Sequence, residues 1–237
     1  MSLRLLVSVG LVLTAVTSTA QAQMISPMLY EGPRIALQTH ADRFLPDAGE
    51  AQTRTRPAVN SAALRYTPSK TRRTANFARF VSKTRTTDPA GAADLERMFA
   101  GRDIIEDIGR ALAPYGMRVD NLADAYTVYW INAWQASRGT NAETSSTTNA
   151  SVRAQAAQAL GASAEVTRAS DATKQELAES LFIQAALIYG AVTQARGNPE
   201  RLHTIGDAAA QGARKMGLDP DAVELTEAGF VFSKQTR

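Results

Sequence analysis

The sequence predicts an all-α protein, a single irregular bundle of six to seven amphipathic helices preceded by a disordered N-terminal lead-in. Apolar residues recur in steps of three and four over most of the chain after residue 69, which is the period of helices with one buried face. Ser, Asp or Asn precedes these stretches and Gly or Pro ends them, as at helix termini. The chain has no cysteine, so its stability must come from packing without disulfides.

The N-terminus predicts a secretory signal over residues 1–22. Arg4 supplies a positive charge, residues 5–16 are largely apolar, and Ala20-Gln21-Ala22 fits a signal-peptidase site, with cleavage before Gln23. The apolar run is shorter than the roughly 20 residues that span a bilayer. We therefore expect a periplasmic or secreted protein without a transmembrane segment in its mature chain.

Residues 23–63 predict a disordered or extended lead-in, because they hold four prolines and few large apolar residues. The stretch 64–67 predicts a short extended piece halted by Pro68. A helical domain is expected over 64–217. Residues 218–237 form a predicted tail that packs on this domain or trails it.

Three helices are expected in the first half of the domain. Ser69 is a plausible cap for a helix to about Arg85, and Asp88-Pro89 opens a helix that Gly101 ends. Asp103, in a capping box with Glu106, opens a third helix, which the Pro114-Tyr115-Gly116 sequence stops.

The next helix is expected from Asp120, as its cap, to Gly139. Residues 139–149 are rich in Ser, Thr and Asn and predict a mobile loop, which a short alanine-rich helix over 151–160 follows.

Two longer helices complete the predicted bundle. A capping box of Thr173 and Glu176 opens a helix that Gly197 terminates, and Asn198-Pro199 opens a helix that ends at Gly217. Small residues on the apolar face of this last helix would let a neighbouring helix approach closely. The tail over 223–232 predicts a short strand or an irregular segment pinned to the core.

Charge is distributed unevenly along the chain. Residues 51–87 contain nine basic residues and no acidic one, whereas residues 88–237 contain 19 acidic and 14 basic residues. A basic arm before a mildly acidic body indicates an anionic partner, or the body itself as that partner.

The basic residues of the first helix form a candidate site for an anionic partner. Arg72, Arg79 and Lys83 share a stripe at helical spacing, and Arg73 lies on the adjoining face with Phe77. Cationic amphipathic helices of this kind lie on anionic membranes or bind polyanions. The alternative, which we favour, is that the aromatic face docks on the body while the arginines face water or pair with its acidic residues.

A second candidate is an aromatic ridge, because Tyr126, Trp130 and Trp134 are spaced by four on one helix. These rings predict either a packed core or a groove for a glycan or peptide. Since burial dominates aromatic positions at helical spacing, the core is favoured.

No set of residues predicts a catalytic centre, a metal site or a cofactor. The two histidines, His40 and His203, lie far apart, and no nucleophile elbow or phosphate loop is present. The carboxylates of residues 103, 106 and 107 are close enough for acid–base work, but on a helix such a run usually only solvates the surface. The acidic spacing at 219–224 lacks the glycine and length of an EF-hand, so a turn and helix cap are expected there.

Three short motifs resemble those of an uncharacterised family of exported bacterial proteins, a domain of unknown function. They are the 64–69 segment LRYTPS, the Tyr129-Trp130 pair and the terminal Gly229-Phe230-Val231. The resemblance would cover about residues 64–231. It implies a bacterial envelope or secreted setting and no mechanism.

These observations favour an exported, non-catalytic helical protein that binds a partner in the bacterial envelope or outside the cell. The expected partner is a protein or an anionic envelope component rather than a specific nucleic acid. The alternative is a cell-wall- or glycan-directed hydrolase that uses acidic residues near the aromatic ridge. An open groove beside Trp130 or Trp134, with two carboxylates roughly 5–9 Å apart, would favour that alternative.

Overall fold

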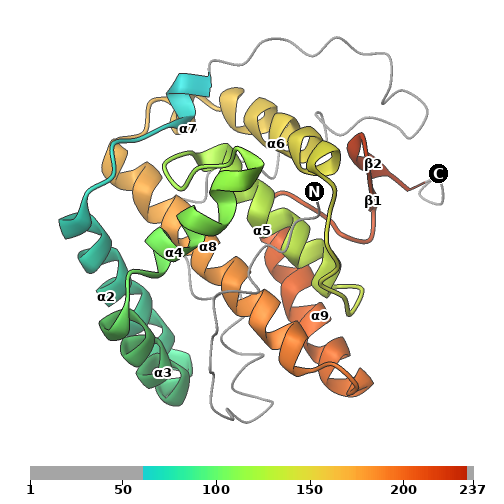
Figure 1. The fold of residues 1–237 in the computed structure, drawn as a ribbon, viewed down its shortest axis with the longest axis horizontal. Coiled ribbons are helices and arrows are strands. Elements are labelled where there is room, and N and C mark those ends of the chain that lie inside the picture. The colour runs from blue at the N-terminus through green and yellow to red at the C-terminus, as the bar shows by residue number, and fades with distance from the viewer. Residues whose placement is uncertain (1–60, 234–237) are drawn as a thin grey trace.

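The computed structural model describes residues 61–233, and their architecture is mostly helical, as the sequence predicts (Figure 1). The predicted signal peptide and nearly all of the predicted lead-in lie outside the described residues. The eight α-helices of the described part are α2 (Lys70–Thr87), α3 (Pro89–Gly101), α4 (Ile104–Leu112), α5 (Leu122–Ala136), α6 (Ser146–Gly161), α7 (Ala164–Thr167), α8 (Asp171–Gln194) and α9 (Pro199–Lys215). The short 3₁₀ turns are η4 (Ser61–Leu64) and η5 (Ala113–Tyr115).

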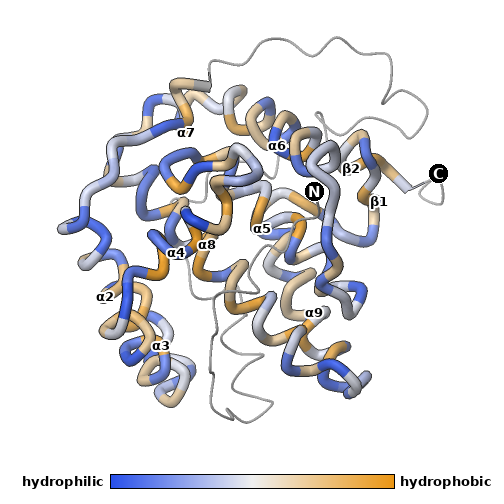
Figure 2. Tube along the Cα trace, viewed as in Figure 1, coloured by the Kyte–Doolittle hydropathy of each residue, from blue (hydrophilic) through white to orange (hydrophobic). Residues whose placement is uncertain are grey.

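Helix α5 forms the centre of the bundle. It packs against α8, α6 and α9, which surround it in Figure 1. Nearly every side chain of α5 is buried, and only Trp134 is partly exposed. A helix that is apolar on most of its circumference belongs in the interior of a bundle. Hydrophobic residues accordingly run along α5 and α8 in Figure 2.

Local capping chemistry explains where several helices begin. The Ser69 hydroxyl accepts a hydrogen bond from the backbone N–H of Arg72, and the Asp88 carboxylate accepts one from Gly91. Asp103 accepts from two backbone N–H groups in the first turn of α4. These three predicted caps are therefore confirmed, because each side chain satisfies an N–H that has no partner inside its helix.

Other predicted starts were wrong by a few residues. The caps are Asn121 for α5 and Ser170 for α8, in place of Asp120 and Thr173. Helix α6 begins at Ser146, within the segment predicted to be a loop, since Ser145 caps it. Thr148 and Asn149 in its first turn are buried, so tertiary contacts outweigh their low helix propensity.

The tail forms a hairpin of two strands, β1 (Val223–Thr226) and β2 (Gly229–Phe232), paired antiparallel with Leu225 opposite Phe230. The Gln155 side chain on α6 donates to the carbonyl of Phe230 at 2.7 Å and accepts from its N–H at 2.9 Å. Gln155 therefore takes the place of a neighbouring strand and fixes the hairpin to α6.

The entrance to the domain matches the predicted extended piece over 64–67 except at its first residue. Leu64 ends the turn η4 and is fully buried. Arg65 forms an isolated antiparallel bridge with Asn121, and the N–H of Tyr66 donates to the carbonyl of Asp120 at 3.2 Å. This segment thus lies beside the start of α5, although more than 50 residues separate the two in sequence.

Candidate functional site

The first two aromatic residues of the ridge lie in the interior. The exposed fraction is 1% for Tyr126 and 2% for Trp130, and their rings meet edge to face at 5.5 Å. The indole N–H of Trp130 donates to the carbonyl of Met216 at 3.0 Å. These two rings pack helix α5 against the end of α9 and do not form the wall of an open groove.

Trp134, the third residue of the ridge, lies at the edge of the core. Its indole N–H donates to the carbonyl of Val223 at 3.1 Å, and its ring meets Phe230 edge to face. The guanidinium of Arg138 lies 4.0 Å from the ring centroid, in cation–π contact. Trp134 therefore joins α5 to the hairpin.

The arginines of the basic stripe, and Arg73 on the face beside it, contact polar groups of the same chain. Arg73 is buried, and its guanidinium donates to Glu179 at 2.9 Å and to Asp103 at 2.5 Å. Arg72 donates to Gln175 at 2.9 Å, and Arg79 forms an ion pair with Glu176 at 3.0 Å. Lys83 is partly exposed. An anionic partner for this stripe stays a prediction.

The contacts of Arg73 belong to a buried polar network between α2 and α8. Glu179 also accepts hydrogen bonds from Asn76 at 2.6 Å and from Gln175 at 2.9 Å. Burial disfavours the charge of Arg73, but its hydrogen bonds to Glu179 and Asp103 outweigh burial and raise its pKa. This network is internally paired, as buried charges must be, and joins two helices.

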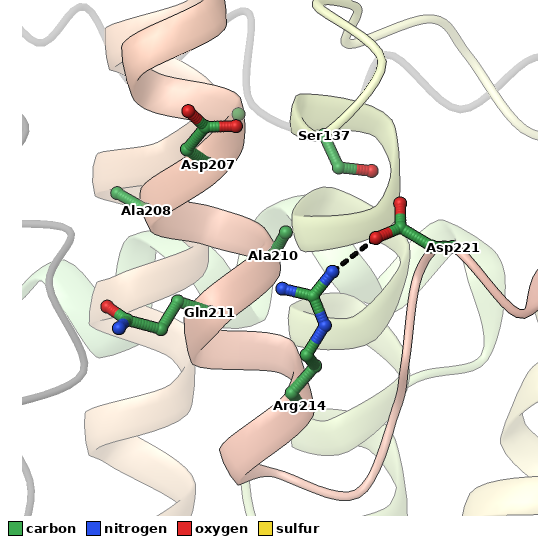
Figure 3. Close-up of a pocket in the computed structure, with 8 residues that line it drawn as sticks. Ser137, Asp207, Ala208, Ala210, Gln211, Arg214 and Asp221 are labelled. Carbon is green, nitrogen blue, oxygen red and sulfur yellow. Dashed lines mark hydrogen bonds and ion pairs between the residues drawn. The ribbon is translucent and has the colours of Figure 1, made fainter.

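An open polar pocket lies at the other end of the bundle, beside α9, and is here called the α9 pocket (Figure 3). Its volume is about 410 Å³. One wall is the exposed side of α9, and the opposite side is formed by Ser137, just after α5, and Asp221, just before β1. The lining residues are Ser137, Gly206, Asp207, Ala208, Ala210, Gln211, Arg214 and Asp221.

Close packing of two helices forms the floor of the α9 pocket. A Cβ atom at Gly206 would lie 2.9 Å from the carbonyl oxygen of Ala136, so only glycine allows this approach of α9 to the end of α5. Gly217, at φ +82°, then turns the chain after α9, which brings Asp219 and Asp221 back to Arg214.

The electrostatics of the α9 pocket centre on Arg214. Its Nε donates to Asp219 at 2.9 Å, and one terminal nitrogen donates to Asp221. Burial opposes the charge of Arg214, but these two carboxylates outweigh burial and raise its pKa. Asp207 and Gln211 are exposed residues of α9 that also line the pocket. The pocket thus presents an oriented guanidinium, carboxylates, an amide and a hydroxyl, which together can recognise a small polar ligand.

Asp124 is a buried carboxyl with a raised pKa, and it lies far from the α9 pocket. Burial raises the pKa of Asp124, although Arg153 forms an ion pair with it and the backbone N–H of Arg118 donates to it at 2.9 Å. Asp124 is in the first turn of α5, and Ser137 follows the last turn. At 1.5 Å per helical residue, this carboxyl is roughly 20 Å from the α9 pocket.

Residues 61–233 contain neither a cluster of metal-ligand side chains nor a helix suited to cross a membrane. No three or more His, Asp or Glu side chains gather there in a way that could hold a metal ion. In the same part of the chain, none of the helices combines the length and the apolar character that a membrane span needs.

Sequence reasoning did not identify the α9 pocket, because its residues come from three separate segments. Two signals for it were present. The acidic spacing of Asp219 and Asp221 predicts a turn and cap, and the small residues of the last helix predict a close neighbour. What the sequence did not show is that this neighbour is the end of α5, which supplies Ser137.

The comparisons with known proteins give a family. One family model, described as a family of unknown function (DUF6683), matches residues 1–233. No curated protein and no solved structure matches the chain. The predicted resemblance to an uncharacterised family is thereby confirmed, and the chain belongs to this family of unknown function.

Proposed function

We propose that the protein is an exported, non-catalytic binding protein of the bacterial envelope or extracellular space, and that the α9 pocket holds its ligand. The ligand is a small polar molecule, or a polar group presented by a partner protein. Export is supported by the charged, apolar and small-residue pattern of residues 1–22.

The observation that carries this proposal is the fixed guanidinium of Arg214 at an open pocket. Two carboxylates from the turn after α9 hold the side chain, so its orientation is set before a ligand arrives. A preorganised polar group costs less conformational entropy on binding than a free arginine does. Two other exposed lining residues of α9, Asp207 and Gln211, offer further acceptors and donors.

The hydrolase alternative has less support from the geometry. A glycoside hydrolase needs one carboxyl that keeps its proton and a second carboxylate a few ångströms away. Asp124 is a carboxyl with a raised pKa, but it already forms an ion pair with Arg153. The α9 pocket is also roughly 20 Å away from it. Trp130, which would line the substrate groove, is buried in the core.

Ligand binding is tested by blocking the α9 pocket. Gln211→Trp places an indole at the pocket wall without touching the core, because Gln211 is exposed. The matched control is Lys215→Trp, an exposed position on the same helix that does not line the pocket. Saturation-transfer NMR of the purified protein with sugars, amino acids and cell-wall fragments should detect a ligand for wild type and Lys215→Trp, and lose it for Gln211→Trp. Equal signals for both variants would refute the pocket as the site.

Export is tested separately. Mass spectrometry of the protein recovered from envelope and medium fractions should give an N-terminus at Gln23. An intact Met1 in a protein confined to the cytoplasm would contradict export.

A further inference from the structure

Three arginines from distant parts of the sequence meet at the start of α5. Arg65 precedes α2, Arg118 precedes α5, and Arg153 lies on α6. Asp120 accepts hydrogen bonds from Arg118 at 2.7 and 2.8 Å and from Arg65 at 3.3 Å. Asp124 pairs with Arg153. We call Arg65, Arg118 and Arg153 the arginine cluster.

The two aspartates hold the arginine cluster from the protein side. The exposed fraction of the side chain is 11% for Asp120 and 0% for Asp124, but 50% for Arg65, 56% for Arg118 and 38% for Arg153. The carboxylates therefore fix the guanidinium groups from below, and the opposite sides of the arginines face water.

Unused hydrogen-bond donors remain on this exposed side. The contacts to the aspartates use Nε and Nη2 of Arg118, Nη2 of Arg65, and Nε and Nη2 of Arg153. These contacts leave Nη1 of each of the three arginines unused. Each guanidinium has five N–H donors, so three terminal NH₂ groups stay available to a ligand.

The charges of the arginine cluster are not balanced. Three arginines face two aspartates, which leaves a net positive charge. Because Arg65 and Arg118 donate to the same oxygen of Asp120, their bonded nitrogens lie within about 6 Å of each other. Two like charges this close repel, and an anion bound between them relieves the repulsion.

We propose that the arginine cluster is a binding site for a phosphate group. A phosphate presents three oxygens to the three free NH₂ groups, and guanidinium forks match its geometry. Its charge of about −1.5 to −2 at pH 7 also offsets the net positive charge better than a carboxylate does. Free phosphate and the phosphomonoester headgroup of phosphatidic acid share this chemistry.

This site is separate from both sites considered above. It lies at the opposite end of α5 from the α9 pocket, roughly 20 Å away. It also differs from Arg73 of α2, which is buried against Glu179. Here the half-exposed Arg65 and Arg118 keep donors in contact with water.

Calorimetric titration of the purified protein tests the proposal with two probes at constant low ionic strength. One probe is sodium phosphate, and the other is vesicles of phosphatidic acid and phosphatidylcholine, with phosphatidylcholine vesicles as blank. The double variant Arg65→Gln/Arg118→Gln should weaken binding at least tenfold. Arg97→Gln, which removes an equally charged surface arginine of α3, should leave it unchanged. Gln211→Trp should also leave it unchanged, which separates this site from the α9 pocket.

Circular dichroism must show that the double variant is folded. If the double variant does not fold, the single variant Arg65→Gln tests the proposal instead. This side chain makes one hydrogen bond to Asp120 and is half exposed, so its replacement should leave the fold intact. Binding of either probe that depends on the cluster supports the proposal, and the responding probe identifies the source of the phosphate. Binding of neither probe, or equal binding by wild type and the cluster variants, overturns it.

Discussion

Replacing Trp130 with alanine is predicted to destabilise the protein severely. The side chain is 2% exposed, so folding buries almost all of its surface, about 200 Å² for a tryptophan. At about 25 cal/mol per Å², this burial stabilises the fold by about 5 kcal/mol. Alanine retains part of that area but leaves a cavity, and the carbonyl of Met216 loses its donor. The expected loss is about 3–5 kcal/mol.

Denaturant unfolding followed by circular dichroism measures this loss from the shift of the midpoint. Trp134→Ala is the matched comparison, because that ring is partly exposed, and its loss should be distinctly smaller. The total stability of a domain is about 5–15 kcal/mol, so the Trp130 variant should be close to unfolding. A loss below about 0.5 kcal/mol, which is typical of surface positions, would refute the placement of Trp130 in the core.

Three further predictions follow from buried groups. Glu179→Gln leaves the guanidinium of Arg73 with Asp103 and, at 4.0 Å, Glu106 as its remaining carboxylates. The variant should lose about 1.5–3 kcal/mol of unfolding free energy, because a buried hydrogen bond between charged groups is weakened; a loss below about 1 kcal/mol in denaturant would contradict the network. Gly206→Ala should destabilise the protein, because overpacking against the end of α5 costs about 1–3 kcal/mol and exceeds the gain in helix propensity; a raised melting temperature would contradict the close approach. Burial raises the pKa of Asp124 above its ordinary 3.8, so the folded state keeps a proton there that the unfolded chain has released. The free energy of unfolding should therefore fall, relative to Asp124→Asn, as the pH rises from 3.8 through the raised pKa of Asp124. Parallel pH profiles of the two proteins would refute a raised pKa for this carboxyl.

Much of the helical framework was predictable because the signals that set it are local. Ser69, Asp88 and Asp103 each cap a helix through contacts within three residues, and such contacts can be read from sequence. Helix α6 was predicted to start too late, since its first turn depends on burial of Thr148 and Asn149 by other segments. The single turn α7 was not predicted at all.

The candidate site was harder to predict because it depends on contacts between distant segments. The sequence identified Arg73 as a residue for an anionic partner, but its neighbours Glu179 and Asp103 became visible only in the fold. In the same way, no sequence motif marks Arg214 as a binding residue. It becomes a candidate ligand contact because Asp221 fixes it and the end of α5 closes the other side of the pocket.

The most direct test of the proposed function locates the ligand on the protein. Backbone amide NMR spectra of the isotope-labelled protein would be recorded before and after adding the ligand found in the saturation-transfer screen. If the ligand binds in the α9 pocket, the largest chemical-shift changes should occur at lining residues, namely Ser137, Gly206, Gln211, Arg214 and Asp221. The Gln211→Trp variant should show no such changes. Shift changes confined to other helices, or the same changes in Gln211→Trp, would contradict the assignment of ligand binding to this pocket.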